Sequence, residues 1–221
     1  RPFAMVDQAT VAAGIAQKRD AILQHAIETF ADEGFRNADV QVIADRAAVG
    51  KGTVYRYFGN KEELFFAASY AVSAELQQYM LDETKQAATP LEQLRAACVA
   101  FAEFFEAKPK HLEVFVQERA QFRGHVPEAH MENHEQWIAA YCRILQQGID
   151  EGEIRPVDPR ATIKALGMLI NGSAYLSCYF QHEESLSALT SFAVDTFLEG
   201  LRARSMTENC RSESSSQSPS K

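Results

Sequence analysis

The residues VGKGTVYRYF at positions 49–58 combine bare backbone, hydroxyl groups and positive charge in one short stretch. Lys51 and Arg56 supply the charge, and Gly52 exposes main chain that a nucleic-acid backbone or base edge can approach closely. Hydroxyls that can donate to phosphate oxygens are carried by Thr53, Tyr55 and Tyr57. Residues 46–61 contain four cations and no carboxylate, whereas the whole chain has a formal net charge of −8. An acidic chain with one short basic segment indicates a local contact with a polyanion, not a surface coated by nucleic acid.

The elements that must position this stretch are helices. A first helix is predicted over about 18–33, where apolar residues recur at the 3.6-residue period. Gly34 is well placed to close this helix in a left-handed conformation, and Phe35 to fold back onto its last turn. A short second helix is predicted over about 40–47, with Asp39 as its N-cap.

The third helix is predicted over about 51–58, after a turn at Val49-Gly50 and before a break at Gly59-Asn60. Val54 and Phe58 lie four residues apart and would hold this helix on the first two. Helix, short helix, turn and short helix is the layout of a helix-turn-helix unit. The third helix is therefore the predicted recognition helix.

The run IADRAAVGKGTVYRYFGNKEEL closely resembles the DNA-binding domain of TetR-family transcriptional regulators, whose pattern is I-A-x-x-A-G-V-S-x-G-T-x-Y-x-Y-F-x-x-K-E-x-L. The resemblance covers about residues 18–64 without a gap. The matching positions are Ile43, Ala44, Ala47, Val49, Gly52, Thr53, Tyr55, Tyr57, Phe58, Lys61, Glu62 and Leu64. Ala48 stands where the family usually has Gly, and Gly50 where it usually has Ser or another cap. Asp39 stands where the family often has Thr, and a carboxylate cannot donate to a phosphate.

By matched position, the resemblance implies contacts with double-stranded DNA. It implies base or groove contacts from Lys51, Gly52, Thr53 and Tyr55. It implies phosphate contacts from Thr53, Tyr57 and Lys61, with Gln41 entering from the second helix. Arg56 is added from its charge alone. The alternatives are that Tyr55 packs in the core and that Lys61 is an ordinary solvated lysine.

Beyond residue 60 the sequence also predicts helices. Asn60 is an N-cap with Glu63 three residues on, and TPLE at 89–92 is a second start signal. These helices are predicted over about 61–83, 90–106, 109–121, 127–151, 159–181 and 185–203. The predicted fold is all-α, with about nine helices. The predicted domains are a flexible arm (1–17), a helix-turn-helix DNA-binding domain (18–62), a helical effector-binding and dimerisation domain (63–204) and a disordered Ser-rich tail (205–221).

The helix predicted over about 159–181 is the most apolar in the chain and carries small residues that allow close helix approach. With the helix over 185–203 it could form a four-helix bundle with a second copy, as the family resemblance also implies. The candidate interface residues are Gly167, Asn171, Ala174 and Phe192. The alternative is that this helix is the central core of a monomer.

The middle helices carry aromatic stripes, and the family resemblance implies a small-molecule effector there, commonly amphipathic or hydrophobic. The candidate pocket residues are Phe101, Phe105, Phe115, Phe122, Trp137, Tyr141 and Tyr175, with Glu118 and Arg119 as a pair or as groups that orient a polar ligand. Such stripes are also what a plain core shows.

His130 and His134 lie four residues apart, on one helix face, where two imidazoles could hold a divalent metal. The zincin pattern needs Glu directly after the first His, and Met131 holds that place. No cysteine lies nearby as a third ligand. We therefore predict two solvated histidines, no metal and no cofactor.

Several other classes of protein do not fit. The four cysteines form no CxxC pair, which argues against a zinc ribbon or a disulfide scaffold and fits a reducing cytoplasm. No run approaches the ~20 apolar residues that span a bilayer, and the N-terminal residues lack the apolar core of a signal peptide.

The leading hypothesis is a homodimeric repressor that releases a palindromic operator when a small molecule binds. One alternative is an activator on the same fold. The other is a helical enzyme, for which no nucleophile–base–acid set or Gly-rich phosphate loop is evident.

Overall fold

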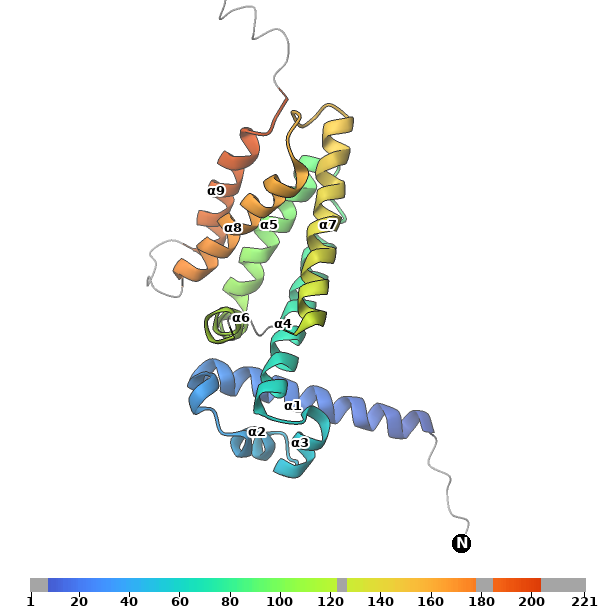
Figure 1. Cartoon of the computed structure of the whole chain (residues 1–221), viewed down its shortest axis with the longest axis vertical. Coiled ribbons are helices and arrows are strands. Elements are labelled where there is room, and N and C mark those ends of the chain that lie inside the picture. The colour runs from blue at the N-terminus through green and yellow to red at the C-terminus, as the bar shows by residue number, and fades with distance from the viewer. Residues whose placement is uncertain (1–7, 123–126, 178–184, 204–221) are drawn as a thin grey trace, which may run out of the picture. The chain divides into compact units, whose positions relative to one another are not determined.

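The computed structural model describes residues 8–122, 127–177 and 185–203, and these ranges contain nine helices and no strand (Figure 1). The helices are α1 (Gln8–Asn37), α2 (Val40–Arg46), α3 (Lys51–Phe58), α4 (Lys61–Thr84), α5 (Pro90–Ala107), α6 (Pro109–Gln121), α7 (Glu128–Asp150), α8 (Pro159–Ser177) and α9 (Leu186–Glu199). The predicted all-α fold is confirmed. Among the described helices, none is both long and apolar enough to cross a membrane. The predicted disordered tail lies outside the described residues.

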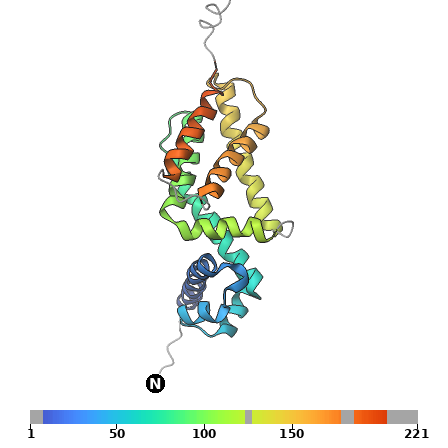
Figure 2. The same cartoon turned by 90° about the vertical axis from the view of Figure 1, so that its left-hand side faces the viewer.

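The chain divides into two compact units, which are described separately. The first comprises Arg1–Tyr79 and Phe104–Glu132, and the second Met80–Glu103 and Asn133–Lys221, as far as these ranges are described. This division differs from the predicted boundary at residue 62, because the first unit takes in most of α4 and all of α6. Within the first unit, α1, α2 and α3 lie together and α6 packs on α1 (Figure 2).

Helix α1 begins at Gln8, well before the predicted start at about residue 18. The described part of the predicted flexible arm, residues 8–17, is therefore helical; this stretch is rich in alanine, the best helix former. Gly34 interrupts the helix with the predicted positive φ, 74°, although its ψ of 156° is not that of a left-handed helix. The Phe35 ring folds back to 6.2 Å from the Phe30 ring, as expected.

The helix-turn-helix bounds agree with the sequence prediction. The Asp39 carboxylate caps α2 by accepting a hydrogen bond from the Gln41 backbone N–H at 2.8 Å. Gly50 precedes α3 without a side-chain cap, and Gly59 ends α3 with φ 77°. The inner faces of α2 and α3 form the small core, whose buried residues are Ile43, Ala44, Val54 and Phe58.

Five phenylalanines from α1, α4 and the end of α6 form an aromatic cluster in the first unit. The Phe30 and Phe65 rings meet edge to face at 5.1 Å, and the Phe35 and Phe122 rings do so at 4.9 Å. Phe66 lies 4.6 Å from Phe122. Aromatic contacts of this kind add to the apolar burial that joins α6 to α1 and α4.

Polar contacts hold α6 on α1 at the Gly34 break. The Gln117 side-chain amide donates to the Phe30 carbonyl at 2.9 Å and accepts from the Phe35 N–H at 3.1 Å. Its two hydrogen bonds satisfy backbone groups on both sides of the break. Lys110 adds an ion pair with Asp32 at 2.7 Å.

In the second unit, the start of α5 is fixed by a reciprocal cap. The Thr89 hydroxyl accepts from the Glu92 N–H at 3.3 Å, and the Glu92 carboxylate accepts from the Thr89 N–H at 3.2 Å. Glu153, just after α7, accepts a hydrogen bond from the Thr89 hydroxyl at 2.6 Å. The predicted start signal at TPLE is thus confirmed. Helices α8 and α9 pack side by side (Figures 1 and 2).

Ala48 is the one described non-glycine residue with positive φ, 53°, and its side chain is exposed. The left-handed conformation costs an L-residue roughly 1–2 kcal/mol that glycine avoids. We therefore expect Ala48→Gly to raise the free energy of unfolding by about 1 kcal/mol, measured by urea denaturation. The neighbouring change Ala47→Gly is the matched control. Ala47 has φ −79°, so glycine there should lower stability by about 0.5–1 kcal/mol. Equal effects of the two changes would contradict strain at Ala48.

Candidate nucleic-acid interface

Helix α3 presents its polar residues on the face opposite its buried pair. Tyr55 and Arg56 are exposed, while Thr53 and Tyr57 are half-buried. Gly52 is exposed, and a Cβ atom added to it would meet no atom within 4 Å. Backbone at this position is therefore open to close approach by a ligand. The alternative that Tyr55 packs in the core does not hold, since 37% of its surface is exposed.

Three of the four cations of residues 46–61 are engaged by oxygens of the protein itself. Arg46 donates to the Thr29 hydroxyl at 3.2 Å. Lys51 pairs with Asp39 at 3.3 Å. Lys61 donates to the Arg36 carbonyl at 3.0 Å. Each ammonium or guanidinium has further N–H groups, so a phosphate can still be added to these contacts.

Asp39 brings a carboxylate to the edge of this surface. The count of charged residues over 46–61 did not include it, because Asp39 lies earlier in the chain. The hydrogen bond from the Gln41 backbone N–H, with the bond from Lys51, holds the pKa of the Asp39 carboxyl below its usual value. Asp39 is thus ionised at neutral pH and offsets the charge of Lys51. The Gln41 side chain is also engaged, donating to Asp45 at 2.7 Å.

Lys61 is half-buried beside α1, with its ammonium 5.2 Å from the centre of the Phe35 ring. Together with the bond to the Arg36 carbonyl, this contact ties the start of α4 to the end of α1. Lys61 is therefore more than an ordinary solvated lysine. Arg56, by contrast, lies 5.7 Å from the Tyr57 ring centre and keeps its guanidinium edge exposed.

The predicted effector residues of the first unit lie in packed clusters. Phe105 and Phe115 contact each other at 4.9 Å, and the Arg119 guanidinium lies 3.9 Å from the Phe115 ring centre. Phe122 belongs to the aromatic cluster with Phe35. Phe105, Phe115 and Phe122 are all buried in these clusters.

Glu118 is a buried carboxylate at the centre of a polar cluster. The Ser69 hydroxyl donates to one of its oxygens, and His130 Nδ1 lies 3.4 Å from the other. Burial raises the pKa of Glu118, but the hydrogen bonds from His130 and Ser69 outweigh burial and leave the pKa below its usual value. The prediction that His130 is a solvated histidine is therefore wrong, because its ring faces the Glu118 carboxylate. No group of three potential metal ligands occurs in the described part of the chain.

The predicted effector residues of the second unit differ in exposure. Phe101 is buried, and Trp137 and Tyr141 lie one helical turn apart on α7. Burial raises the pKa of Tyr141, with a smaller contribution from Cys98. The Trp137 indole N–H is buried and has no partner in the described chain, so it is open to an acceptor on a ligand. Tyr175 is 47% exposed, which suits a surface contact better than an enclosed pocket.

The predicted dimer residues are divided between two faces of α8 and α9. Ala174 is 1% exposed and packs within its own unit. Asn171 is half-buried and donates to the Gly167 carbonyl at 2.7 Å. Phe192 on α9 is 74% exposed. The outer face of α8 carries Met168, Tyr175 and Leu176, which the sequence reading did not single out as interface residues.

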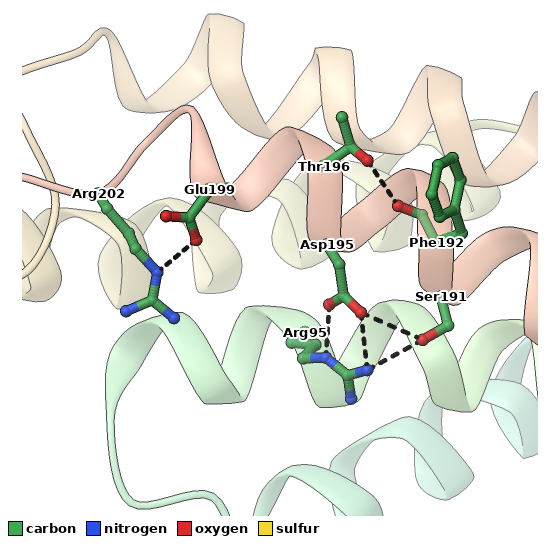
Figure 3. Close-up of polar contacts among 7 residues, drawn as sticks. All are labelled: Arg95, Ser191, Phe192, Asp195, Thr196, Glu199 and Arg202. Carbon is green, nitrogen blue, oxygen red and sulfur yellow. Dashed lines mark hydrogen bonds and ion pairs between the residues drawn. The ribbon is translucent and has the colours of Figure 1, made fainter.

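Arg95 of α5 joins α9 through polar contacts in the second unit (Figure 3). Its guanidinium binds both Asp195 oxygens, at 2.6 and 3.0 Å, and the Ser191 hydroxyl at 2.9 Å. This bidentate contact holds the pKa of Asp195 below its usual value. In Figure 3 the Phe192 ring points away from Arg95. Helix α9 is therefore joined to α5 by a polar contact along one side, while its buried residues are Leu186, Thr190, Val194 and Leu198 and Phe192 stays exposed.

Comparisons with known proteins match both parts of the chain. A family model described as "Bacterial regulatory proteins, tetR family" matches residues 22–68, and one described as "Tetracyclin repressor-like, C-terminal domain" matches residues 87–175. The uncharacterised HTH-type transcriptional regulator YhgD of Bacillus subtilis is 29% identical over 184 residues, 82% of this chain and 93% of the relative. The HTH-type transcriptional repressor KstR2 of Mycobacterium tuberculosis is 28% identical over 147 residues, 66% and 74% of the two chains.

A solved structure has the same fold. It is the transcriptional regulator FadR of Bacillus subtilis in complex with stearoyl-CoA, with a TM-score of 0.73 and 23% identity. The similarity covers 83% of this chain and 99% of that one.

The Asp39–Lys51 pair leads to a prediction for nucleic-acid binding. Asp39→Asn keeps a side chain that caps helices as well as Asp does, removes a negative charge and frees Lys51. We expect it to tighten binding to duplex DNA roughly two- to fivefold, since a unit charge at 4 Å in water is worth about 1 kcal/mol. Fluorescence anisotropy at fixed salt measures the change. Glu113→Gln, exposed on α6, makes the same change in net charge and should have a smaller effect. Weaker binding by Asp39→Asn would contradict the inferred repulsion.

Proposed function

This chain belongs to the TetR family of bacterial transcriptional regulators, and we propose that it is a ligand-responsive homodimeric repressor. Two copies place α3 in successive major grooves of a palindromic operator, and a small molecule bound by the helical domain lowers DNA affinity. The observation that carries the proposal is the outer face of α3, where Gly52, Tyr55 and Arg56 are exposed above a buried apolar pair. Repression is proposed in preference to activation because the similar protein KstR2 is a repressor.

A dimer is proposed because one short recognition helix binds DNA weakly, and pairing two half-sites raises the affinity. The interface is the outer face of α8 and α9, with Met168 and Phe192, 77% and 74% exposed, as its centre. A Cβ atom added to Gly172 on α8 would meet no atom within 4 Å, so helix backbone there is open to a partner helix. A second copy would cover apolar side chains that otherwise contact water.

Helix α6 is proposed to carry the effector signal within the first unit. Gln117 holds α1 at its break, and the next residue, Glu118, contacts Ser69 of α4 and His130 of α7. A displacement of α6 would therefore act on α1 directly. For release of DNA, the effector must bind the DNA-incompetent arrangement better than the DNA-bound one. Native mass spectrometry of the purified protein is the first search for a co-purified effector, with stearoyl-CoA as the first added probe.

DNA binding is tested by an anisotropy titration with duplexes from the region upstream of the protein's own gene. We expect the wild type to bind with a salt-dependent affinity. The double variant Arg56→Ala, Tyr57→Phe should bind at least tenfold more weakly, because it loses one charged and one hydroxyl phosphate donor. Arg143→Ala, on the exposed surface of α7, is the control for charge and should bind as the wild type does. Absence of salt-dependent binding, or equal binding by the double variant, would defeat the proposal. Reporter output in a deletion strain separates a repressor from an activator.

The dimer is tested by sedimentation. We expect a wild-type mass of twice the 24.6 kDa chain. Phe192→Asp should shift the protein toward monomer, because it places a charge in an apolar interface. Leu81→Asp, at an exposed apolar position of α4 in the same unit, should leave the dimer intact. A wild-type monomer at micromolar concentration would contradict the dimer.

A further inference from the structure

We propose that Arg19 of α1 binds a DNA phosphate and that the Phe58 ring holds its guanidinium in place for this contact. The proposal rests on the proposed DNA-binding function. Arg19 lies before residues 22–68, the segment that matches the DNA-binding family model. The family resemblance, which begins at about residue 18, assigns no contact to Arg19, and Arg19 also lies outside the basic segment 46–61.

The position of Arg19 is set by the end of the recognition helix. The carbon at the centre of its guanidinium lies 5.4 Å from the centre of the Phe58 ring. Phe58 is the last residue of α3 and is buried, so its ring is fixed by the core. A guanidinium over an aromatic ring is attracted by the π electrons, and its N–H groups along the outer edge remain available. That edge is the part that binds a phosphate bidentately.

Arg19 differs from the nearby lysines because no oxygen among the described residues is its hydrogen-bond or ion-pair partner. Lys51 is paired with Asp39, and Lys61 donates to the Arg36 carbonyl. Within the described residues, no carboxylate lies within ion-pair distance of Arg19, and its side chain is exposed. A phosphate would therefore bind Arg19 without first displacing an internal acceptor. A contact to a cation that is held in place and has no competing acceptor retains more of its free energy than a contact to one that is already partly neutralised.

The length of α3 places Arg19 opposite Lys51. Helix α3 has eight residues, and at 1.5 Å per residue it is about 12 Å long, which is about the width of the major groove. A helix of that length that crosses the groove brings its two ends near the two phosphate backbones. Lys51 lies at the first residue of α3, and Arg19 lies against the last. Arg19 would thus contact the phosphate backbone beside the C-terminal end of α3.

A phosphate contact makes a prediction that a packing role does not. Arg19→Gln should weaken binding about tenfold and lower the slope of log affinity against log salt by about one. The loss should be the same on a duplex selected by the wild type from a random pool and on a scrambled duplex, because phosphates carry no sequence information. Lys18→Gln is the matched control. It removes the same charge from the preceding residue, which is exposed and contacts no aromatic ring in the described structure. The DNA affinity of Lys18→Gln should therefore fall by less than about threefold.

Anisotropy titrations at several salt concentrations measure both quantities, and thermal unfolding checks that each variant is folded. If Arg19→Gln lowers the unfolding midpoint, Arg19→Lys separates a phosphate contact from a packing role. This variant keeps the charge but lacks the planar guanidinium, so its DNA affinity should lie between those of the wild type and Arg19→Gln. Equal losses of DNA affinity in Lys18→Gln and Arg19→Gln would mean that both residues act only through a diffuse electrostatic field, and would overturn the proposal. So would an unchanged salt slope, or a loss confined to the selected duplex. A wild type that does not bind DNA would instead overturn the proposed function, and that result appears before any variant is measured.

Discussion

Helix α3 depends on the burial of Val54 and Phe58, because eight residues are too few for a helix to persist in water by itself. Each of these side chains is buried against the neighbouring helices, which stabilises it by roughly 1.5–3 kcal/mol relative to an exposed position. Since the two lie four residues apart, their burial also fixes the rotation of α3 about its axis. Tyr55 and Arg56 are outside because Val54 and Phe58 are inside. The apolar core thereby determines which polar groups are offered to a polyanion.

Local signals were enough to predict the bounds of most helices. The cap at Asp39, the glycines at 50 and 59, and the Thr89–Glu92 pair act within four residues of chain, so they can be read in a sequence. The start of α1 was missed, because an alanine-rich stretch has high helix propensity without an apolar stripe to mark it. The outer face of α3 was also predicted, since the apolar spacing that buries one side of a helix exposes the other.

The partners of the charged residues could not be predicted in this way. Lys51 meets a carboxylate twelve residues before it, and Lys61 meets a carbonyl twenty-five residues before it. Such pairs depend on the angles at which helices pack, and the spacing of residues along one helix does not determine these angles. For the same reason, aromatic spacing could not separate pocket from core: Phe122 follows the last residue of α6, and only the packed structure shows its contacts with Phe35 and Phe66.

Helix α9 obeys the same rule as α3, because it packs on its own unit through the buried side chains of Leu186, Val194 and Leu198. Its contacts to its own unit include a polar pair, Arg95 with Asp195, whose side chains are about half exposed. Exposed ion pairs contribute little to stability, so the value of this one lies in its geometry: a bidentate guanidinium allows α9 few rotations. With Leu186, Val194 and Leu198 turned inward, Phe192 is left in water, where a large apolar side chain is unfavourable until a surface covers it. In each helix, the contacts made inside the chain select the face left for a partner. The polar outer face of α3 supports the proposed contact with DNA, and the exposed Phe192 of α9 supports the proposed contact with a second copy.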